Sequence, residues 1–154
     1  MDTKTFLQKA LRGDGRYCLF VARKSDYAKD QKFYDSIDEI EQAARAFDAD
    51  GYDVYFALAV LGESDSRKVT NVKTLSSFFL DLDCGPSKDF PTQADALNEL
   101  KEFCKATKLP KPFILDSGRG VHVYWFLTEP VARDDWIPVA GKLKRLCAEH
   151  EFAA

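Results

Sequence analysis

The sequence predicts an α+β fold in which helices pack on one face of a mixed β-sheet. Amphipathic segments with helical spacing alternate with short apolar runs along the chain. Helices that cross between strands, together with one hairpin, are typical of this class. Two helix starts are marked by capping boxes, Ser36 with Glu39 and Thr92 with Asp95, in which side chains satisfy free backbone amides. We expect the face of the sheet without helices to carry the functional residues.

The order of the elements follows from periodicity and from turn-forming residues. Apolar residues at helical spacing predict helices over residues 3–11, 36–51, 92–107 and 136–147. Apolar runs predict strands over residues 17–22, 53–61, 77–83, 113–116 and 121–127. The polar stretches 23–35 and 63–74 lack a period and are predicted to be loops. Arg67, in the second of them, is interpreted as a solvated side chain, with a phosphate contact as the alternative.

The composition indicates an ordinary globular protein of 154 residues, 45% hydrophobic and 31% charged. No apolar run reaches the ~18 residues that a membrane span needs. The net charge is −3 and the pI about 5.4, which argues against a broad cationic surface for nucleic acid, so any such binding is expected to be local. The four cysteines lack the spacing of a zinc site. We expect them to be reduced and the protein to be cytoplasmic.

A short acidic motif ends the third predicted strand. Asp81 and Asp83 follow an apolar run and precede a Gly-Pro pair. Because side chains alternate along a strand, the two carboxylates are expected on one face, about 7 Å apart, with Leu80 and Leu82 on the other. Ionised carboxylates so placed repel each other, and a hard divalent cation such as Mg²⁺ relieves the repulsion. The pattern predicts a metal site, and a solvated strand end is the alternative for this triplet taken alone.

A glycine-rich turn opens the last predicted strand. Gly118 and Gly120 flank Arg119 and follow Ser117. The glycines permit a sharp turn, and backbone amides in such turns can form an anion-binding concavity. The hydroxyl of Ser117 and the guanidinium of Arg119 suit phosphate oxygens, and His122 begins the strand at the same end. These residues together are suited to hold a triphosphate, whereas each taken alone is more typical of a plain hairpin or a structural histidine.

In combination, the two motifs resemble those of the archaeo-eukaryotic primase superfamily, and within it the primase-polymerases of phages, plasmids and mobile elements. In that family an apolar strand ends in DxD, as Phe78–Asp83 does here. A serine or glycine turn is then followed by a strand histidine and often a Tyr-Trp pair, as in Ser117–Trp125. The resemblance covers about Val54–Leu146. It implies a catalytic core like the RNA-recognition motif.

Carried over by position, the resemblance implies roles for individual residues. Catalysis would fall to Asp81, Asp83 and His122, and Mg²⁺ or Mn²⁺ would be bound by Asp81 and Asp83. The phosphates of the nucleotide would be bound by Ser117, Gly118, Arg119 and His122.

The third motif of the family, an acidic residue on a later strand that completes the metal site, has no match. None of the acidic residues after His122 ends an apolar strand. We therefore expect residues 1–154 to be a single domain, the N-terminal part of a primase-polymerase catalytic domain that is interrupted before its third carboxylate. Two metal ions need carboxylates from more than one direction, so weak metal binding and poor catalysis are expected from this part alone.

The function that the resemblance implies is that of a DNA primase or polymerase. Such an enzyme transfers nucleotides from (d)NTPs along a single-stranded DNA template by a two-metal mechanism in DNA replication. A replicative helicase, as a domain or a separate protein, is a further partner that the resemblance leaves open. One alternative is a non-catalytic module that binds nucleic acid or nucleotide, which the missing carboxylate and the acidic pI favour. Another is a sugar transferase with a DxD metal site, in which the hairpin would have no role.

Overall fold

The computed structural model describes all 154 residues and confirms the α+β class. The helices are α1 (Thr3–Ala10), α2 (Ile37–Ala49), α3 (Gln93–Thr107) and α4 (Arg133–Glu149), with a short 3₁₀ helix at Val69–Asn71. The strands are β1 (Tyr17–Arg23), β2 (Lys29–Tyr34), β3 (Tyr52–Phe56), β4 (Val60–Leu61), β5 (Val72–Asp83), β6 (Phe113–Asp116) and β7 (Gly120–Ala132). Both predicted capping boxes are present, at the starts of α2 and α3.

The strands form one sheet in the order β2-β1-β3 and another in the order β4-β5-β7-β6. The chain also divides into two compact units: unit 1 contains Met1–Ser76 and Thr128–Arg133, and unit 2 contains Ser77–Leu127 and Asp134–Ala154. Strands β5 and β7 contribute residues to both units. That residues 1–154 form a single domain stays a prediction, and each unit is described by itself.

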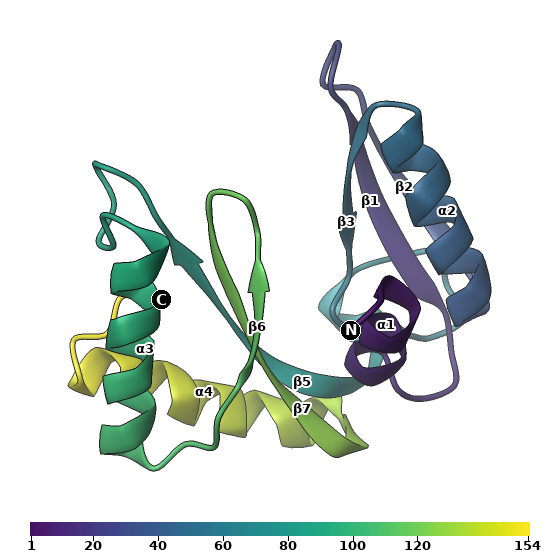
Figure 1. Cartoon of the computed structure of the whole chain (residues 1–154). Helices are drawn as coiled ribbons and strands as arrows, with labels where there is room; N and C mark the ends of the chain where they lie inside the picture. Colours follow the sequence, from purple (N-terminus) through teal and green to yellow (C-terminus); the bar gives the residue numbers. More distant parts are fainter. The chain divides into compact units, whose positions relative to one another are not determined.

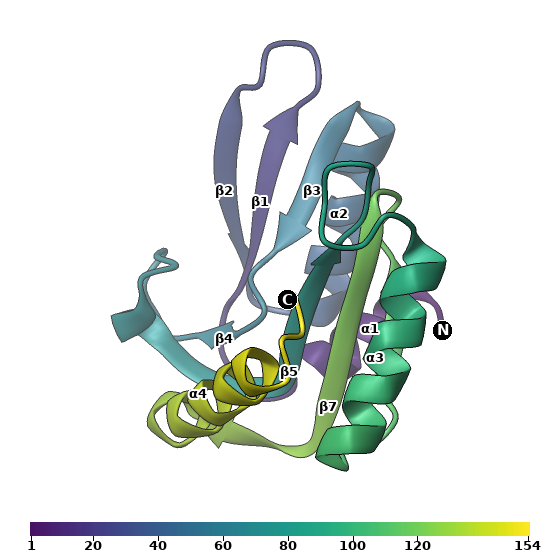
Figure 2. The ribbon, with the colours of Figure 1, turned by 90° about the vertical axis from the view of Figure 1, so that its left-hand side faces the viewer.

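In unit 1, helices cover one face of the three-stranded sheet (Figures 1 and 2). Phe47 of α2 contacts Tyr52 of β3, with ring centroids 5.2 Å apart. Phe6 of α1 contacts Phe56 of the same strand at 5.8 Å. Because alternate residues of a strand share a face, both helices lie on the side of β3 that carries Tyr52 and Phe56. Tyr55 therefore points to the opposite side.

In unit 2, a hydrophobic core lies between the strands and the helices α3 and α4. Its buried members are Leu80, Leu82, Phe90, Ala96, Leu100, Phe103, Cys104, Val121, Val123, Trp125, Cys147 and Phe152. Trp136 of α4 stacks on Phe78 at 5.4 Å, and its Nε1 donates a hydrogen bond to the carbonyl of Ser77. These contacts fix α4 against β5. The core side of β5 is therefore filled, and the polar side chains of this strand point away from it.

The sequence prediction differs from the structure at four places, one of which is β7, which extends to Ala132 rather than ending at Leu127. Residues 29–34, predicted as part of a loop, form β2, an exposed strand at the edge of its sheet. Residues 53–61, predicted as one strand, form β3 and β4. Strand β5 begins at Val72 rather than at Ser77. The polar character of an edge strand hides it from a search for apolar runs, because neither of its faces needs to be fully buried.

The sequence analysis predicts a mixed sheet, with both parallel and antiparallel strand pairs, and the structure differs in this respect. The pairs β1–β2, β1–β3, β4–β5 and β6–β7 are all antiparallel. The end of β5 lies beside the start of β7, since the amide of Cys84 donates to the carbonyl of Arg119, so these two strands also run in opposite directions.

No helix has the length and the apolar character to span a bilayer. All four cysteines are free thiols.

Candidate nucleotide and metal site

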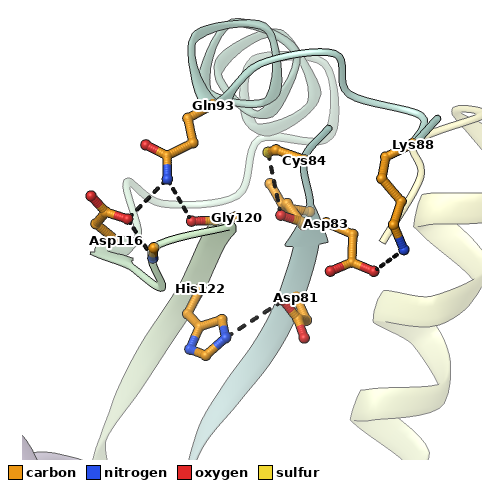
Figure 3. Close-up of polar contacts among 10 residues, drawn as sticks. Asp81, Asp83, Cys84, Lys88, Gln93, Asp116, Gly120 and His122 are labelled. Carbon is orange, nitrogen blue, oxygen red and sulfur yellow. Dashed lines mark hydrogen bonds and ion pairs between the residues drawn. The ribbon is translucent and has the colours of Figure 1, made fainter. Parts of the chain in front are cut away.

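The acidic end of β5 has the alternation that the sequence predicts, and Figure 3 shows its two carboxylates. Leu82 is fully buried and Leu80 nearly so. The side chains of Asp81 and Asp83 are 54% and 68% exposed. Burial of the two leucines thus fixes the register of the strand, and the same register presents both carboxylates to solvent on the opposite face.

His122 of β7 lies next to the first of these carboxylates. Its Nε2 is 3.5 Å from Oδ1 of Asp81, and its ring contacts Phe79 edge-on, with centroids 5.3 Å apart. The flanking residues Val121 and Val123 are buried. The core thus holds β7 in the register that turns the imidazole toward Asp81, so the structure brings together two of the three residues predicted to be catalytic.

Asp83, the third of them, has a cationic partner that the sequence analysis did not identify. Nζ of Lys88 lies 2.7 Å from Oδ2 of Asp83. This hydrogen bond, aided by the charge of the lysine, holds the pKa of Asp83 below its ordinary value. Both side chains are at least half exposed, so the pair is open to exchange with another cation.

Tyr124 follows His122 on the same face of β7 and contacts Phe79, with centroids 5.0 Å apart. Burial, and to a smaller extent the negative charge of Asp81, raises the pKa of Tyr124 to about 12. The phenol is therefore neutral at physiological pH.

The turn between β6 and β7 is tied closely to the end of β5. Gly118 has a φ of +85°, which favours glycine. Gly120 is needed for a different reason: a Cβ at this position would lie 2.3 Å from the carbonyl oxygen of Leu82. The hydrogen bond from the amide of Cys84 to the carbonyl of Arg119, 3.2 Å long, adds a second tie. The two glycines singled out in the sequence thus bring the turn against the acidic strand.

A side-chain network around Asp116 and Gln93 holds this turn (Figure 3). Nε2 of Gln93, at the start of α3, donates to Oδ1 of Asp116 at 2.9 Å and to the carbonyl of Gly120 at 3.1 Å. Oδ1 of Asp116 also accepts from the amide of Gly118 at 2.7 Å. The hydrogen bond from the Gly118 amide and, to a smaller extent, the one from Gln93 hold the pKa of Asp116 below its ordinary value. Neither Gln93 nor Asp116 was predicted to belong to the site.

This network changes how the turn could bind an anion. The amide of Gly118 donates to Asp116 and that of Ser117 donates to the carbonyl of Gly120, so two of the turn's amides already have partners. The side chains of Ser117 and Arg119 are exposed. An anion at this turn would therefore be held mainly by the hydroxyl and the guanidinium.

We expect replacement of Gln93 by leucine to loosen the turn. Loss of one donor should move the pKa of Asp116 back toward 3.8, its ordinary value, measurable by carboxyl-carbon NMR titration. The pKa of Asp116 is depressed, so the stability from these hydrogen bonds is present above about pH 4 and is lost as the pH falls through the folded-state pKa. Gln42→Leu on the exposed side of α2 should leave the titration unchanged, and an unchanged titration in Gln93→Leu would contradict the network.

A cleft of about 720 Å³ borders the acidic end of β5. Its lining includes Asp81, Asp83, Trp136 and Lys144. Strand β4 pairs with β5 only at Val72 and Thr74, among the residues of unit 1. In unit 2, β5 therefore has β7 on one side and this cleft, walled by α4, on the other.

The donor chemistry of this site fits a hard divalent cation. Asp81 and Asp83 offer exposed carboxylate oxygens on one face, the ligand type that Mg²⁺ and Mn²⁺ prefer, with room for water or phosphate oxygens. Their present neighbours, Lys88 and His122, are themselves able to carry positive charge. The structure nevertheless contains no group of three or more histidine, cysteine or acidic side chains that could hold a metal ion. Asp81 and Asp83 are thus two candidate ligands, and no third acidic, histidine or cysteine side chain is grouped with them.

No protein-family model matches the sequence, and no curated protein is similar to it in sequence. The structure is similar to the solved AEP domain of the primase-polymerase of cyanophage S-2L, with a TM-score of 0.66 over 96% of this chain and 72% of that one. The sequence identity is 18%, so the similarity is one of fold. The expected α+β fold, similar to that of a primase-polymerase catalytic core, is thereby confirmed.

Proposed function

We propose that the chain is the nucleotide- and metal-binding part of a DNA primase or polymerase, which extends a strand along a single-stranded DNA template in DNA replication. The observation that carries the proposal is the contact of His122 with Asp81 at the ends of two neighbouring strands, with Asp83 two residues further along the same face. This constellation lies on a fold similar to that of a primase-polymerase. Nothing in the fold or the site supports a helicase partner.

In this proposal Asp81 and Asp83 hold Mg²⁺ or Mn²⁺. The bound ions would supply Lewis-acid chemistry, neutralising phosphate charge and activating a 3′-hydroxyl. His122 would donate a hydrogen bond to a phosphate oxygen, from a position beside Asp81 that its strand fixes. The side chains of Ser117 and Arg119 would bind the outer phosphates and offset the charge that develops on pyrophosphate. The contribution of the chain is thus positional and electrostatic.

Complete catalysis would require a further carboxylate. The cleft beside β5 reaches Asp81 and Asp83 from the side opposite β7. An acidic residue presented there would complete the site without displacing any described strand.

The second candidate is a non-catalytic module that binds nucleic acid or nucleotide. The lack of any group of three possible metal ligands favours it, because a two-metal site needs carboxylates from more than one direction. Nucleotide binding without any catalysed extension, even at high Mn²⁺ concentration, would support this candidate.

The test of the leading proposal is calorimetric titration of residues 1–154 with a deoxynucleoside triphosphate, with and without Mn²⁺. We expect binding that requires Mn²⁺, followed by extension of a primed oligonucleotide template in a gel assay. Binding that is the same without Mn²⁺ would contradict the metal site. Metal-dependent binding with no extension would favour the non-catalytic module.

We expect Lys88→Gln to tighten the binding of Mn²⁺ alone. Lys88 holds one oxygen of Asp83 and repels an incoming cation, so its removal should raise the affinity about threefold, the effect of one exposed ion pair. Free Mn²⁺ is measured by electron paramagnetic resonance. Lys105→Gln on α3, which removes the same charge elsewhere in unit 2, should have little effect. Weaker binding in Lys88→Gln would show that the lysine supports the cation site.

A further inference from the structure

The three-stranded sheet of unit 1 has one face that no helix of that unit covers. Helices α1 and α2 contact Tyr52 and Phe56 of β3, so they lie on the opposite side from Tyr55. The register places Phe20 of β1 directly beside Tyr55, and Gln31 of β2 beside Phe20. In Figure 2 the three strands lie in front of α2. One end of this side, at Cys18 and Phe33, packs against Leu61, Val72 and Leu75. We call the remaining part, which carries Phe20, Gln31, Tyr55 and Lys29, the open face.

Two aromatic rings and a guanidinium are grouped on the open face. The ring centroids of Phe20 and Tyr55 lie 5.9 Å apart, with the rings inclined at 47°. The guanidinium carbon of Arg67 lies 5.0 Å from the centroid of Phe20. Tyr55, on the edge strand β3, is 55% exposed, so one face of its large aromatic ring is open to a ligand. These groups offer flat surfaces for stacking beside a positive charge.

The charge of the open face favours an anionic partner. None of the ion pairs in unit 1 includes Arg67 or Lys29, and Lys29 lies on this face because it pairs with Ala22 in the register. The acidic residue of the same face, Asp53, has Nζ of Lys24 at 3.8 Å. The positive charge is therefore local, which agrees with a net charge of −3 for the whole chain.

We propose that the open face binds single-stranded DNA, with a base stacked on Tyr55 and a backbone phosphate held by Arg67, whose guanidinium lies over the neighbouring ring of Phe20. Exposed aromatic rings interleaved with cations are the chemistry by which proteins hold single strands without reading their sequence. A folded polypeptide partner would need a larger apolar patch, and duplex DNA would hide the faces of its bases from the rings. The choice of DNA rests on the proposed function; the stacking site itself does not depend on Asp81, Asp83 or metal.

The test is fluorescence anisotropy of a labelled oligothymidylate, about 20 nucleotides long to exceed the usual site size, with residues 1–154 and its variants. Tyr55→Leu should weaken binding about tenfold, the loss typical of one stacked base, whereas Tyr55→Phe should retain it. Arg67→Gln should lower the slope of log affinity against log salt by about 0.7, the contribution of one phosphate contact on a single strand.

Two controls make the outcome decisive. Arg45→Gln removes the same charge from α2, where Arg45 pairs with Glu41, and should leave both affinity and salt slope unchanged. Circular dichroism verifies that each variant is folded. If wild-type protein does not bind the oligonucleotide, or if Tyr55→Leu and Arg67→Gln bind it like the Arg45 control, the proposal is overturned.

Failure of this proposal and failure of the proposed function are distinguishable. The wild-type protein could bind DNA but show no Mn²⁺-dependent binding of triphosphate. This result would support the proposal for the open face and overturn only the proposed nucleotide site. The reverse result would overturn only the open face.

Discussion

Replacement of Asp81 by asparagine is expected to abolish Mn²⁺-dependent binding of a nucleoside triphosphate, with a loss in affinity of about 100-fold or more. Asparagine has the same shape but lacks the charge that a hard cation requires. Loss of groups that merely support a metal ligand already costs about 10–100-fold, and Asp81 is proposed as a ligand itself. Its carboxylate is exposed, so the change should leave the core of unit 2 intact. Calorimetric titration measures the effect.

The matched control for this experiment is Glu102→Gln. Glu102 is an exposed acidic residue of α3, and the substitution changes the net charge by the same amount. It should leave triphosphate binding unchanged. Equal affinities of Asp81→Asn and Glu102→Gln would rule out Asp81 as a metal ligand.

Replacement of Gly120 by alanine is expected to lower the free energy of unfolding of unit 2 by about 3 kcal/mol. The added Cβ would lie 2.3 Å from the carbonyl oxygen of Leu82, a distance that only a separation of β5 and β7 can relieve. That separation would also move His122 away from Asp81, so the substitution should impair both stability and triphosphate binding. Both tryptophans of the chain, Trp125 and Trp136, belong to unit 2. Their fluorescence during urea unfolding therefore follows this unit.

Two other glycines of unit 2 calibrate the measurement. A Cβ at Gly118 would meet nothing within 4 Å, but the φ of +85° opposes any side chain, so Gly118→Ala should cost about 1 kcal/mol. Gly141 lies inside α4, where a Cβ would meet only Nη1 of Arg145 at 4.0 Å. Gly141→Ala should stabilise the helix by about 0.5–1 kcal/mol. A similar cost for Gly120→Ala and Gly118→Ala would mean that the close approach to Leu82 does not limit stability.

The elements that the sequence predicted well are those whose determinants are local. The capping boxes at Ser36 and Thr92 satisfy amides within four residues, and both helices begin where these residues place them. The acidic end of β5 was predictable because burial of Leu80 and Leu82 fixes the alternation. The placement of His122 near Asp81 was predicted from the resemblance to a known family. The periodicity of apolar residues alone does not predict a contact between two distant strands.

The residues that sequence reasoning missed act across long separations or through exposed backbone. Gln93 reaches Asp116 over 23 positions of the chain, and at the first position of a helix it has no distinguishing pattern. Lys88 had a weak signal, since it follows Asp83 after a Gly-Pro turn that reverses the chain. Strand β2 lacks a continuous apolar run, because an edge strand needs none. A pattern of burial cannot reveal elements that are barely buried.

Strand β6, at the outer end of the four-stranded sheet, bears on the solubility of the protein. Ile114 and Leu115 are 40% and 39% exposed, and an apolar edge is a template for pairing with another molecule. The strand is only four residues long, with Pro112 before it and the carboxylate of Asp116 at its end. A short edge between a proline and a charge resists stacking into aggregates. Asp116, which accepts a hydrogen bond within the turn, thus also opposes edge-to-edge association of β6 with another molecule.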